Sequence, residues 1–247
     1  MWCIAELTPE YIARMDDVLA RYERPYDSRE PVGCLDEKPV SLHADVRAPR
    51  PARPGHLAKR DHESQRCGVA NIFGVVEPKA GRHLTCVTPN RSAAAFAKMV
   101  RTIVHAYPRA RRIHLVLDKL NTHTEKALTD HCGTRLGRRL WRRLTVHYTP
   151  NHGRWLNRAA IELSLVARQG PGKRRMALRT QLQAATRAWK TRANRRHTKI
   201  AWRVTRKDAR QTFGYQSKLS KRSETWCETQ GLSEILCRRH NFRKRMA

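Results

Sequence analysis

The apolar run at residues 112–118 constrains the fold more than any other stretch of the chain. Its isoleucine and two leucines alternate, and Val116 between the leucines is apolar as well. Apolar residues on both faces are typical of a strand that lies inside an α/β sheet and is covered by helices on each side. The run therefore predicts a central, doubly covered strand, and that strand ends in an acidic residue, Asp118.

The rest of the pattern predicts a mixed sheet. We expect strands over residues 32–43, 67–77, 83–89, 112–118 and 144–148, helices over 8–24, 92–107, 124–132, 155–166 and 176–194, and a short helical or extended piece at 200–204. An early hairpin followed by alternating helices and strands favours an α/β, ribonuclease H-like fold over a doubly wound nucleotide-binding fold. Neither glycine-rich phosphate loop of the nucleotide binders occurs in the sequence.

The charge predicts a polyanionic partner. The 247 residues carry 51 Lys and Arg against 21 Asp and Glu, a formal net charge of +30, which points to nucleic acid. The surplus is uneven, because residues 168–247 hold 23 basic and only 4 acidic residues. We expect an N-terminal helix and linker at 1–31, a ribonuclease H-like domain at 32–168, and a basic, partly helical region at 169–247 with a disordered end.

The sequence predicts neither a membrane-spanning helix nor a signal peptide. No apolar run approaches the roughly 18 residues that a spanning helix needs, and the start of the chain lacks the basic and apolar regions of a signal peptide. The seven cysteines are odd in number and form no CxxC pair, which argues against a disulfide scaffold or a zinc ribbon. We therefore expect the chain in a reducing compartment, the cytoplasm.

Two aspartates stand where an acidic residue needs a partner. Asp118 follows the apolar run, and Asp36 lies within the strand expected at 32–43. A carboxylate in an apolar sheet must be paired or bound to a metal, and on neighbouring strands two of them can hold Mg²⁺ or Mn²⁺. The residues alone leave two alternatives open. Asp118 could be a helix cap or an arginine partner, and Asp36 could belong to a surface charge cluster with Glu37 and Lys38.

Three motifs follow one another along the chain. They are Cys-Leu-Asp-Glu-Lys-Pro at 34–39, Leu-Val-Leu-Asp-Lys-Leu-Asn-Thr-His at 115–123, and Tyr-Thr-Pro-Asn-His-Gly-Arg-Trp-Leu-Asn-Arg-Ala at 148–159. In this order and spacing they resemble the motifs of DDE-superfamily insertion-sequence transposases, the bacterial branch related to the mariner elements. The resemblance extends from about Trp2 to Thr225.

The resemblance implies a fold, an activity and partners. It implies a ribonuclease H-like catalytic domain in which three carboxylates and two divalent metals, Mg²⁺ or Mn²⁺, cleave and join DNA. The DNA partners would be the transposon ends and a target, in the course of transposition and DNA recombination, and the resemblance allows a homodimer. A bacterial member of the family is expected in the cytoplasm, associated with the nucleoid.

The first two motifs carry over residue by residue. Asp36 corresponds to the first catalytic, metal-binding aspartate of the family, and Asp118 corresponds to the second. Asn121 and His123 also match the second motif. Lys119 departs from it, because it replaces the usual Asn and offers the neighbouring carboxylate a competing cation.

The third motif departs from the family more seriously. Trp155 and Asn157 match the pattern Trp-Leu-Asn-x-(Ala/Ile)-Glu, but Ala160 stands where the family has the third carboxylate. Glu162 is the candidate catalytic replacement, although two residues along a helix correspond to a rotation of about 200°. Trp155 itself could be a packing residue or could stack on a base. Family members also begin with a helix-turn-helix region, so we expect a truncated, degenerate copy.

The basic residues after position 168 are candidate DNA contacts. They are denser than on an ordinary solvated surface and have few acidic neighbours, which favours nucleic-acid contact. The candidates are Lys173, Arg174, Arg175, Arg195, Arg196 and Lys199. Two functions therefore compete: a DDE transposase impaired by Ala160, and a non-catalytic DNA-binding remnant of one. A basic RNA-coating protein, the third class, predicts no acidic residues in the sheet.

Overall fold

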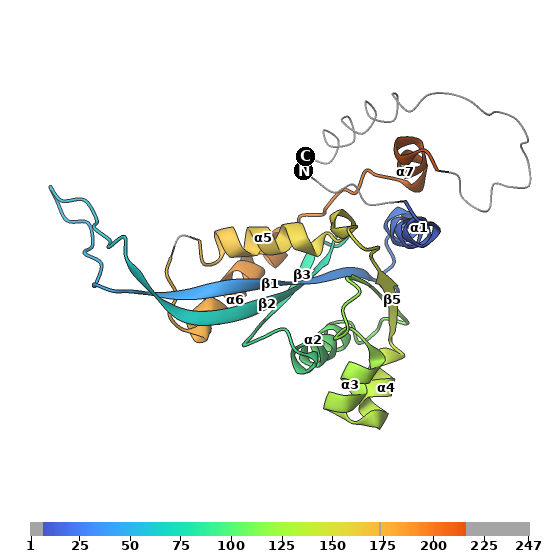
Figure 1. The fold of residues 1–247 in the computed structure, drawn as a ribbon, viewed down its shortest axis with the longest axis horizontal. Helices are drawn as coiled ribbons and strands as arrows, with labels where there is room; N and C mark the ends of the chain where they lie inside the picture. The colour runs from blue at the N-terminus through green and yellow to red at the C-terminus, as the bar shows by residue number, and fades with distance from the viewer. Residues whose placement is uncertain (1–6, 173, 216–247) are drawn as a thin grey trace, which may run out of the picture.

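A five-stranded mixed sheet forms the centre of the protein (Figure 1). The computed structural model describes residues 7–172 and 174–215. The strands are β1 (Val32–Asp45), β2 (Ser64–Glu77), β3 (Arg82–Thr88), β4 (Ile113–Leu117) and β5 (Leu144–Tyr148). They lie in the order β3-β2-β1-β4-β5, with β1, β2 and β3 antiparallel and with β4 parallel to both β1 and β5. This strand order confirms the predicted ribonuclease H-like arrangement.

Helices cover both faces of the sheet. They are α1 (Pro9–Glu23), α2 (Ala93–Ala106), α3 (Glu125–Cys132), α4 (Thr134–Trp141), α5 (Ala159–Gln169), α6 (Arg179–Arg196), α7 (Arg206–Phe213) and the short 3-10 helix η1 (Arg154–Leu156). Helices α2, α3 and α4 lie on one face, and α1, α5, α6 and α7 lie on the other (Figure 1). In the described ranges, no helix is both long and apolar enough to cross a membrane.

Strand β4 is buried on both faces, as its sequence predicted. All five of its residues are buried. Leu115 and Leu117 lie in the apolar cluster beneath α2, α3 and α4. Val116 points the other way, into the cluster that α1 and α5 cover. The successive apolar residues Leu115, Val116 and Leu117 therefore serve two separate parts of the core.

Polar side chains and a glycine set several helix ends. Thr8, Ser92 and Thr124 each accept a hydrogen bond from the backbone N–H three residues later and so begin α1, α2 and α3. Gly133 ends α3 with φ at +80°, a backbone conformation that favours glycine. These boundaries agree with the expected ones because capping is a local effect that the sequence displays directly.

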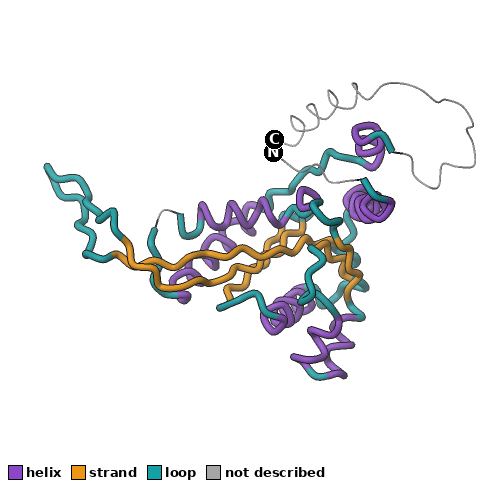
Figure 2. The backbone as a smooth tube through the Cα atoms, viewed as in Figure 1, coloured by secondary structure: helices purple, strands orange, loops and turns teal. Residues whose placement is uncertain are grey.

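The hairpin of β1 and β2 extends beyond the body of the protein (Figure 2). Its tip, residues 46–63, contains only two isolated bridges, from Arg50 to Lys59 and from Arg53 to His56. Three prolines in the first part of this tip remove backbone donors, so continuous strand pairing stops there. The tip is an irregular loop, as expected.

Three local expectations differ from the structure. Helices α4 and α7 were not predicted. Helix α4 begins directly after Gly133, the residue that ends α3, so the sequence pattern indicated the end of α3 but not the start of a second helix. The helix expected at 155–166 is divided into η1 and α5, because Asn157 between them is extended. Residues 200–204 form neither helix nor strand.

Gly137 determines how closely α4 packs on α3. A β-carbon at Gly137 would lie 2.6 Å from the Cα of Thr129, a backbone atom that can move only if α3 moves. We therefore expect Gly137→Ala to lower the free energy of unfolding by about 1–3 kcal/mol, measured by urea denaturation. Thr134→Ala, at an exposed position of the same helix, is the control, with an expected change below about 0.5 kcal/mol. Equal changes for the two variants would contradict this account.

Candidate active site

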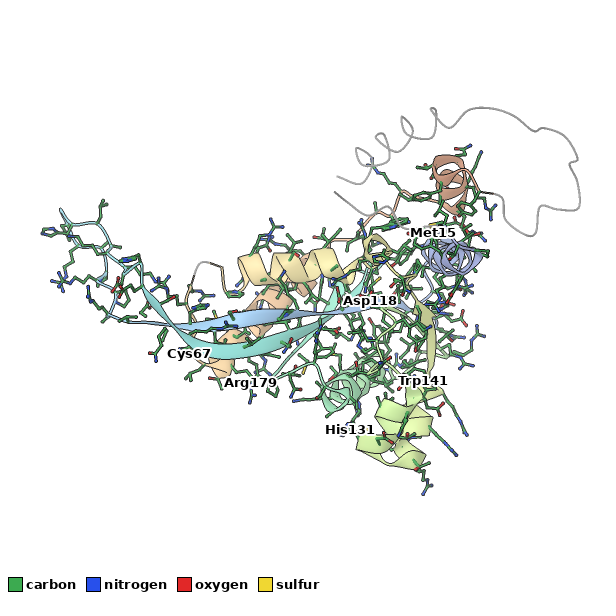
Figure 3. The ribbon with its side chains drawn as sticks, in the orientation of Figure 1. Met15, Cys67, Asp118, His131, Trp141 and Arg179 are labelled. Atoms are coloured by element: carbon green, nitrogen blue, oxygen red, sulfur yellow. The ribbon has the colours of Figure 1, made fainter. Side chains whose placement is uncertain are left out.

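Parallel pairing of β1 and β4 brings the two predicted aspartates together. Cys34 in β1 pairs with Val116 in β4. Asp36 follows Cys34 by two residues, and Asp118 follows Val116 by two residues. Because side chains in strands alternate with a period of two, both aspartates extend from the sheet face of Cys34 and Val116. Asp118 lies where β4 ends (Figure 3).

A single guanidinium group faces both carboxylates. Asp36, only 6% exposed, accepts a hydrogen bond from the backbone N–H of Glu37 at 2.8 Å, and its Oδ2 lies 3.9 Å from Nη2 of Arg154. Asp118 accepts a hydrogen bond from the Thr149 hydroxyl at 3.0 Å, and its Oδ2 lies 3.7 Å from Nε of Arg154. The Arg154 side chain is 71% exposed, so the cation lies on the solvent side of the pair.

Burial and mutual repulsion perturb the acids. Burial raises the pKa of the Asp36 carboxyl to about 6, and the negative charges of Asp118 and Glu37 add to the increase, while Arg154 opposes it. The pKa of Glu37 is also raised, first by burial and then by the charge of Asp118. The site therefore concentrates negative charge where a cation would be stabilised.

The donor set fits a divalent cation in part. Carboxylate oxygens are the ligands that Mg²⁺ and Mn²⁺ prefer, and the two aspartates already share one positive group. Within residues 7–172 and 174–215, however, no three His, Cys, Asp or Glu side chains form a metal-ligating group. Asp36 and Asp118 therefore fit one cation better than the two that the resemblance implies.

Ala160 and Glu162 lie on different flanks of helix α5. Ala159, the first residue of α5, is buried in the cluster above β1 and β4. Glu162 points toward β3. Two residues along a helix correspond to a rotation of about 200°, so the methyl group of Ala160 points away from the β3 side. The residue that the motif resemblance aligns with the family's third carboxylate therefore carries no acid.

Glu162 is held away from the two aspartates. Its Oε2 lies 3.0 Å from Nε2 of His83 in β3, and β3 is two strands removed from β1 in the sheet. Trp189 of α6 contacts the His83 ring edge-on, with 5.2 Å between ring centroids. The structure thus pairs Glu162 with His83, and a role for Glu162 in place of the missing acid stays a prediction.

Two further motif residues fix the backbone around the site. His123 is buried, and its Nδ1 donates a hydrogen bond at 3.0 Å to the backbone carbonyl of Asp118. Asn157 is buried too and donates at 2.7 Å to the carbonyl of Leu35 in β1. The first contact holds the end of β4, and the second holds the start of α5 against the strand that carries the first aspartate.

The remaining motif residues lie further from the carboxylates. Trp155 packs among aromatic side chains, with its Nε1 donating to the Tyr11 hydroxyl at 3.3 Å and its ring stacked on Trp202. Asn121 is exposed in the loop after β4, and Lys119 is exposed as well. In the described part of the chain, Arg154 and not Lys119 lies within ion-pair distance of the second aspartate.

Two candidate DNA contacts are engaged by the protein itself. The Arg174 guanidinium donates to the backbone carbonyls of Gly170 and Pro171, directly after α5. Arg175 pairs with the Asp45 carboxylate at 2.9 Å and so joins this segment to the end of β1. Both groups have fewer donors left for phosphate oxygens.

The other candidate DNA contacts are exposed or lie outside the described residues. Arg195 and Arg196 are exposed at the end of α6. Lys199 is exposed three residues later and lines a cavity of about 640 Å³ beside α1. Lys173 lies outside the described residues.

Sequence reasoning missed Arg154 and Thr149. Both residues stand inside the third quoted motif, so they were visible but had no assigned role. A signal existed in principle, because two carboxylates in an apolar sheet need a cation and a hydrogen-bond donor. The sequence alone did not show which arginine or hydroxyl would reach them, since that depends on the path of the chain after β5.

The raised pKa of Asp36 makes stability depend on pH. The folded carboxyl titrates near 6 and the unfolded one near 3.8, so the folded state binds the proton more tightly. Stability is then lost as the pH rises from about 4 to about 6. The Asn side chain of Asp36→Asn cannot ionise, so this variant does not lose that stability. As the pH rises from 4 to 7, its free energy of unfolding should therefore increase by about 1–3 kcal/mol relative to that of the wild type.

Urea denaturation at both pH values measures this difference. Asp45→Asn is the control, because the adjacent Arg60 lowers the pKa of that carboxyl and reverses the sign of the pH effect. Parallel pH profiles for the wild type and Asp36→Asn would contradict the assignment.

Known proteins resemble the chain in sequence and in fold. Residues 31–183 match the model of the DDE superfamily endonuclease family. The Mos1 mariner paired end complex with Mn has a TM-score of 0.46 at 16% identity, over 80% of this chain and 61% of that one. The Mos1 Strand Transfer Complex has a TM-score of 0.37 at 16% identity, over 82% of this chain and 66% of that one.

The catalytic domain of Mos1 mariner transposase has a TM-score of 0.34 at 14% identity, over 81% of this chain and all of that one. The chain thus spans less than two thirds of the Mos1 chain in the paired end complex. No curated protein matches the sequence. Because the family match covers more than half of the residues, the chain belongs to the DDE superfamily endonucleases.

Proposed function

We propose that the chain is a DNA transposase catalytic domain in which metal-dependent DNA cleavage and strand transfer are impaired. One observation carries the proposal: Asp36 and Asp118 share one face of the sheet and one counter-ion, while the residue that the resemblance aligns with the third carboxylate is Ala160. The family match supports the reaction class, and the alanine supports the impairment.

Two residues would hold the metal and two would keep them in position. Asp36 and Asp118 provide the carboxylate oxygens for Mg²⁺ or Mn²⁺. Thr149 donates to one oxygen of Asp118, so the other oxygen, which faces Arg154, would be the one to bind the metal. His123 holds the backbone of the same aspartate. When bound, a divalent cation lowers the pKa of a coordinated water and stabilises the leaving oxygen of a phosphodiester.

Arg154 would have two roles at this site. Without another cation, its guanidinium balances the two aspartates. Its exposed side chain can instead turn outward and donate to a DNA phosphate, for which the planar guanidinium is well suited. We propose that this exchange frees the carboxylates when DNA is bound.

The finer assignments are part of the same proposal. We propose transposon-end and target DNA as substrates, a bacterial insertion sequence as the source, a cytoplasmic, nucleoid-associated location, and a homodimer as the assembly. The motif resemblance supports the source. We also propose three parts of the chain: an N-terminal part at 1–31, a catalytic domain at 32–168 and a basic region at 169–247. Helix α6, which belongs to the basic region, packs on β3 of the catalytic domain.

The competing function is a non-catalytic, DNA-binding remnant of a transposase. Specific observations favour it: Ala160 removes one carboxylate, and Glu162 is committed to His83. Both functions predict DNA binding, so only cleavage distinguishes them.

Restoring the third carboxylate tests the proposal. Supercoiled plasmid is incubated with Mn²⁺ and wild type, Ala160→Glu, or Ala160→Glu with Lys119→Asn, and nicked circles are measured. We expect little nicking by the wild type and an increase of about tenfold or more with the restored glutamate, the scale on which groups around a metal affect such sites. Ala160→Gln is the matched control, because it adds the same volume without the charge.

The outcomes separate the two functions. Nicking that appears with Glu but not with Gln, and disappears when Asp36→Asn is added, supports an impaired enzyme. Wild-type nicking equal to that of Ala160→Glu would overturn the impairment. No nicking by any variant with bound DNA would favour the remnant.

A further inference from the structure

Helix α4 carries four arginines along one face. Arg135, Arg138, Arg139 and Arg142, named here the arginine stripe, stand at intervals of three, one and three residues. At 100° per residue they fall within an arc of about 100°. Arg142 follows the last residue of α4 with helical φ and ψ, so the stripe continues to its end.

The opposite face of α4 fixes this orientation. Leu140 is buried in the cluster with α2 and α3, and Leu136 packs against it. Gly137 is in close contact with the backbone of α3. These three residues lie on the side of the helix away from the arginines, so the stripe must face solvent. All four arginines are exposed, and Figure 3 shows long side chains directed away from this corner of the protein.

No acidic group of the described chain neutralises the stripe. Four arginines at exposed or half-buried positions do have acidic partners: Arg14 pairs with Glu10, Arg24 with Glu30, Arg60 with Asp45 and Arg206 with Glu23. Within residues 7–172 and 174–215, none of the four stripe side chains forms an ion pair. Basic residues in the last turn of a helix balance its dipole, whose C-terminal end carries about half a negative charge. That effect needs fewer than four arginines and does not require them to share one face.

We propose that the arginine stripe binds the phosphate backbone of duplex DNA, at a surface separate from the two aspartates. The choice of DNA rests on the proposed function. The stripe extends over about 10 Å of helix axis, a length over which duplex DNA carries about six phosphate charges. Guanidinium groups bind phosphate oxygens in pairs of hydrogen bonds, so four of them fix the position of a duplex without reading its sequence.

The position of the stripe makes this a second DNA contact. Helix α4 lies on the sheet face of α2 and α3, whereas Arg195 and Arg196 of α6 lie on the opposite face. One straight duplex cannot lie flat on both faces. The stripe therefore engages either a second duplex or a different part of a bent one.

The salt dependence of binding tests the inference. The affinity of the full chain for a mixed-sequence DNA duplex is measured by fluorescence anisotropy in EDTA over a series of salt concentrations. The test variant replaces all four stripe arginines by Gln. Each lost phosphate contact reduces the slope of log K against log salt by about 0.9, so we expect a decrease of about 3 to 4.

A matched variant controls for net charge. It replaces Arg14, Arg24, Arg60 and Arg206 by Gln, which removes the same four charges from ion-paired positions, and we expect a slope change well below that of the test variant. Circular dichroism checks that both fold. Arg139→Gln alone, with an expected change of about 0.9, provides the same test if the fourfold variant does not fold.

Each outcome decides the inference independently of catalysis. A decrease for the stripe variant alone supports it. Equal decreases in the two variants, an unchanged slope, or a decrease seen only with duplex RNA would overturn it. Because binding is measured without metal, the test stays valid even if the wild type never nicks DNA. If the wild type does nick DNA but the stripe variant keeps the wild-type slope of log K against log salt, only this inference is overturned and the proposed function is not.

Discussion

The site depends on repulsion between two carboxylates in an apolar sheet. The parallel register of β1 and β4 places Asp36 and Asp118 on one face, and neither can leave without moving a strand of the core. Their burial and their charge explain the features around them: the raised pKa of Asp36, caused first by burial and then by the charge of Asp118, the Thr149 hydrogen bond, and the approach of Arg154 from solvent. A divalent cation would satisfy the same constraint.

The fold was largely predictable because its signals are local. The doubly apolar run of β4, the caps at Thr8 and Ser92, and the glycine at the end of α3 each act within a few residues. Juxtaposition of the two aspartates depended on more than the pattern, because Asp36 lies within β1, which ends only at Asp45, and the register of β1 on β4 sets it beside the end of β4. The early hairpin and the later alternating units then left few possible strand orders.

Contacts between distant segments were not predictable. Arg154 reaches the aspartates only because the chain turns back after β5, and Glu162 meets His83 only because α5 crosses β2 at a given rotation. Helix α4 was missed for a different reason. Its two faces differ mainly through the arginines on one of them, and among its eight residues only Gly137 and Leu140 are buried, so there was little apolar pattern from which to predict it.

Arg154 changes what the two acids cost the fold. Two carboxylates side by side in a sheet repel each other, and folding has to oppose that repulsion. The Arg154 guanidinium lies 3.9 Å from one oxygen of Asp36 and 3.7 Å from one oxygen of Asp118, so it offsets part of the repulsion. Because its side chain is 71% exposed, dissolved salt screens this attraction, and the folded protein should tolerate the two acids less well as the ionic strength rises.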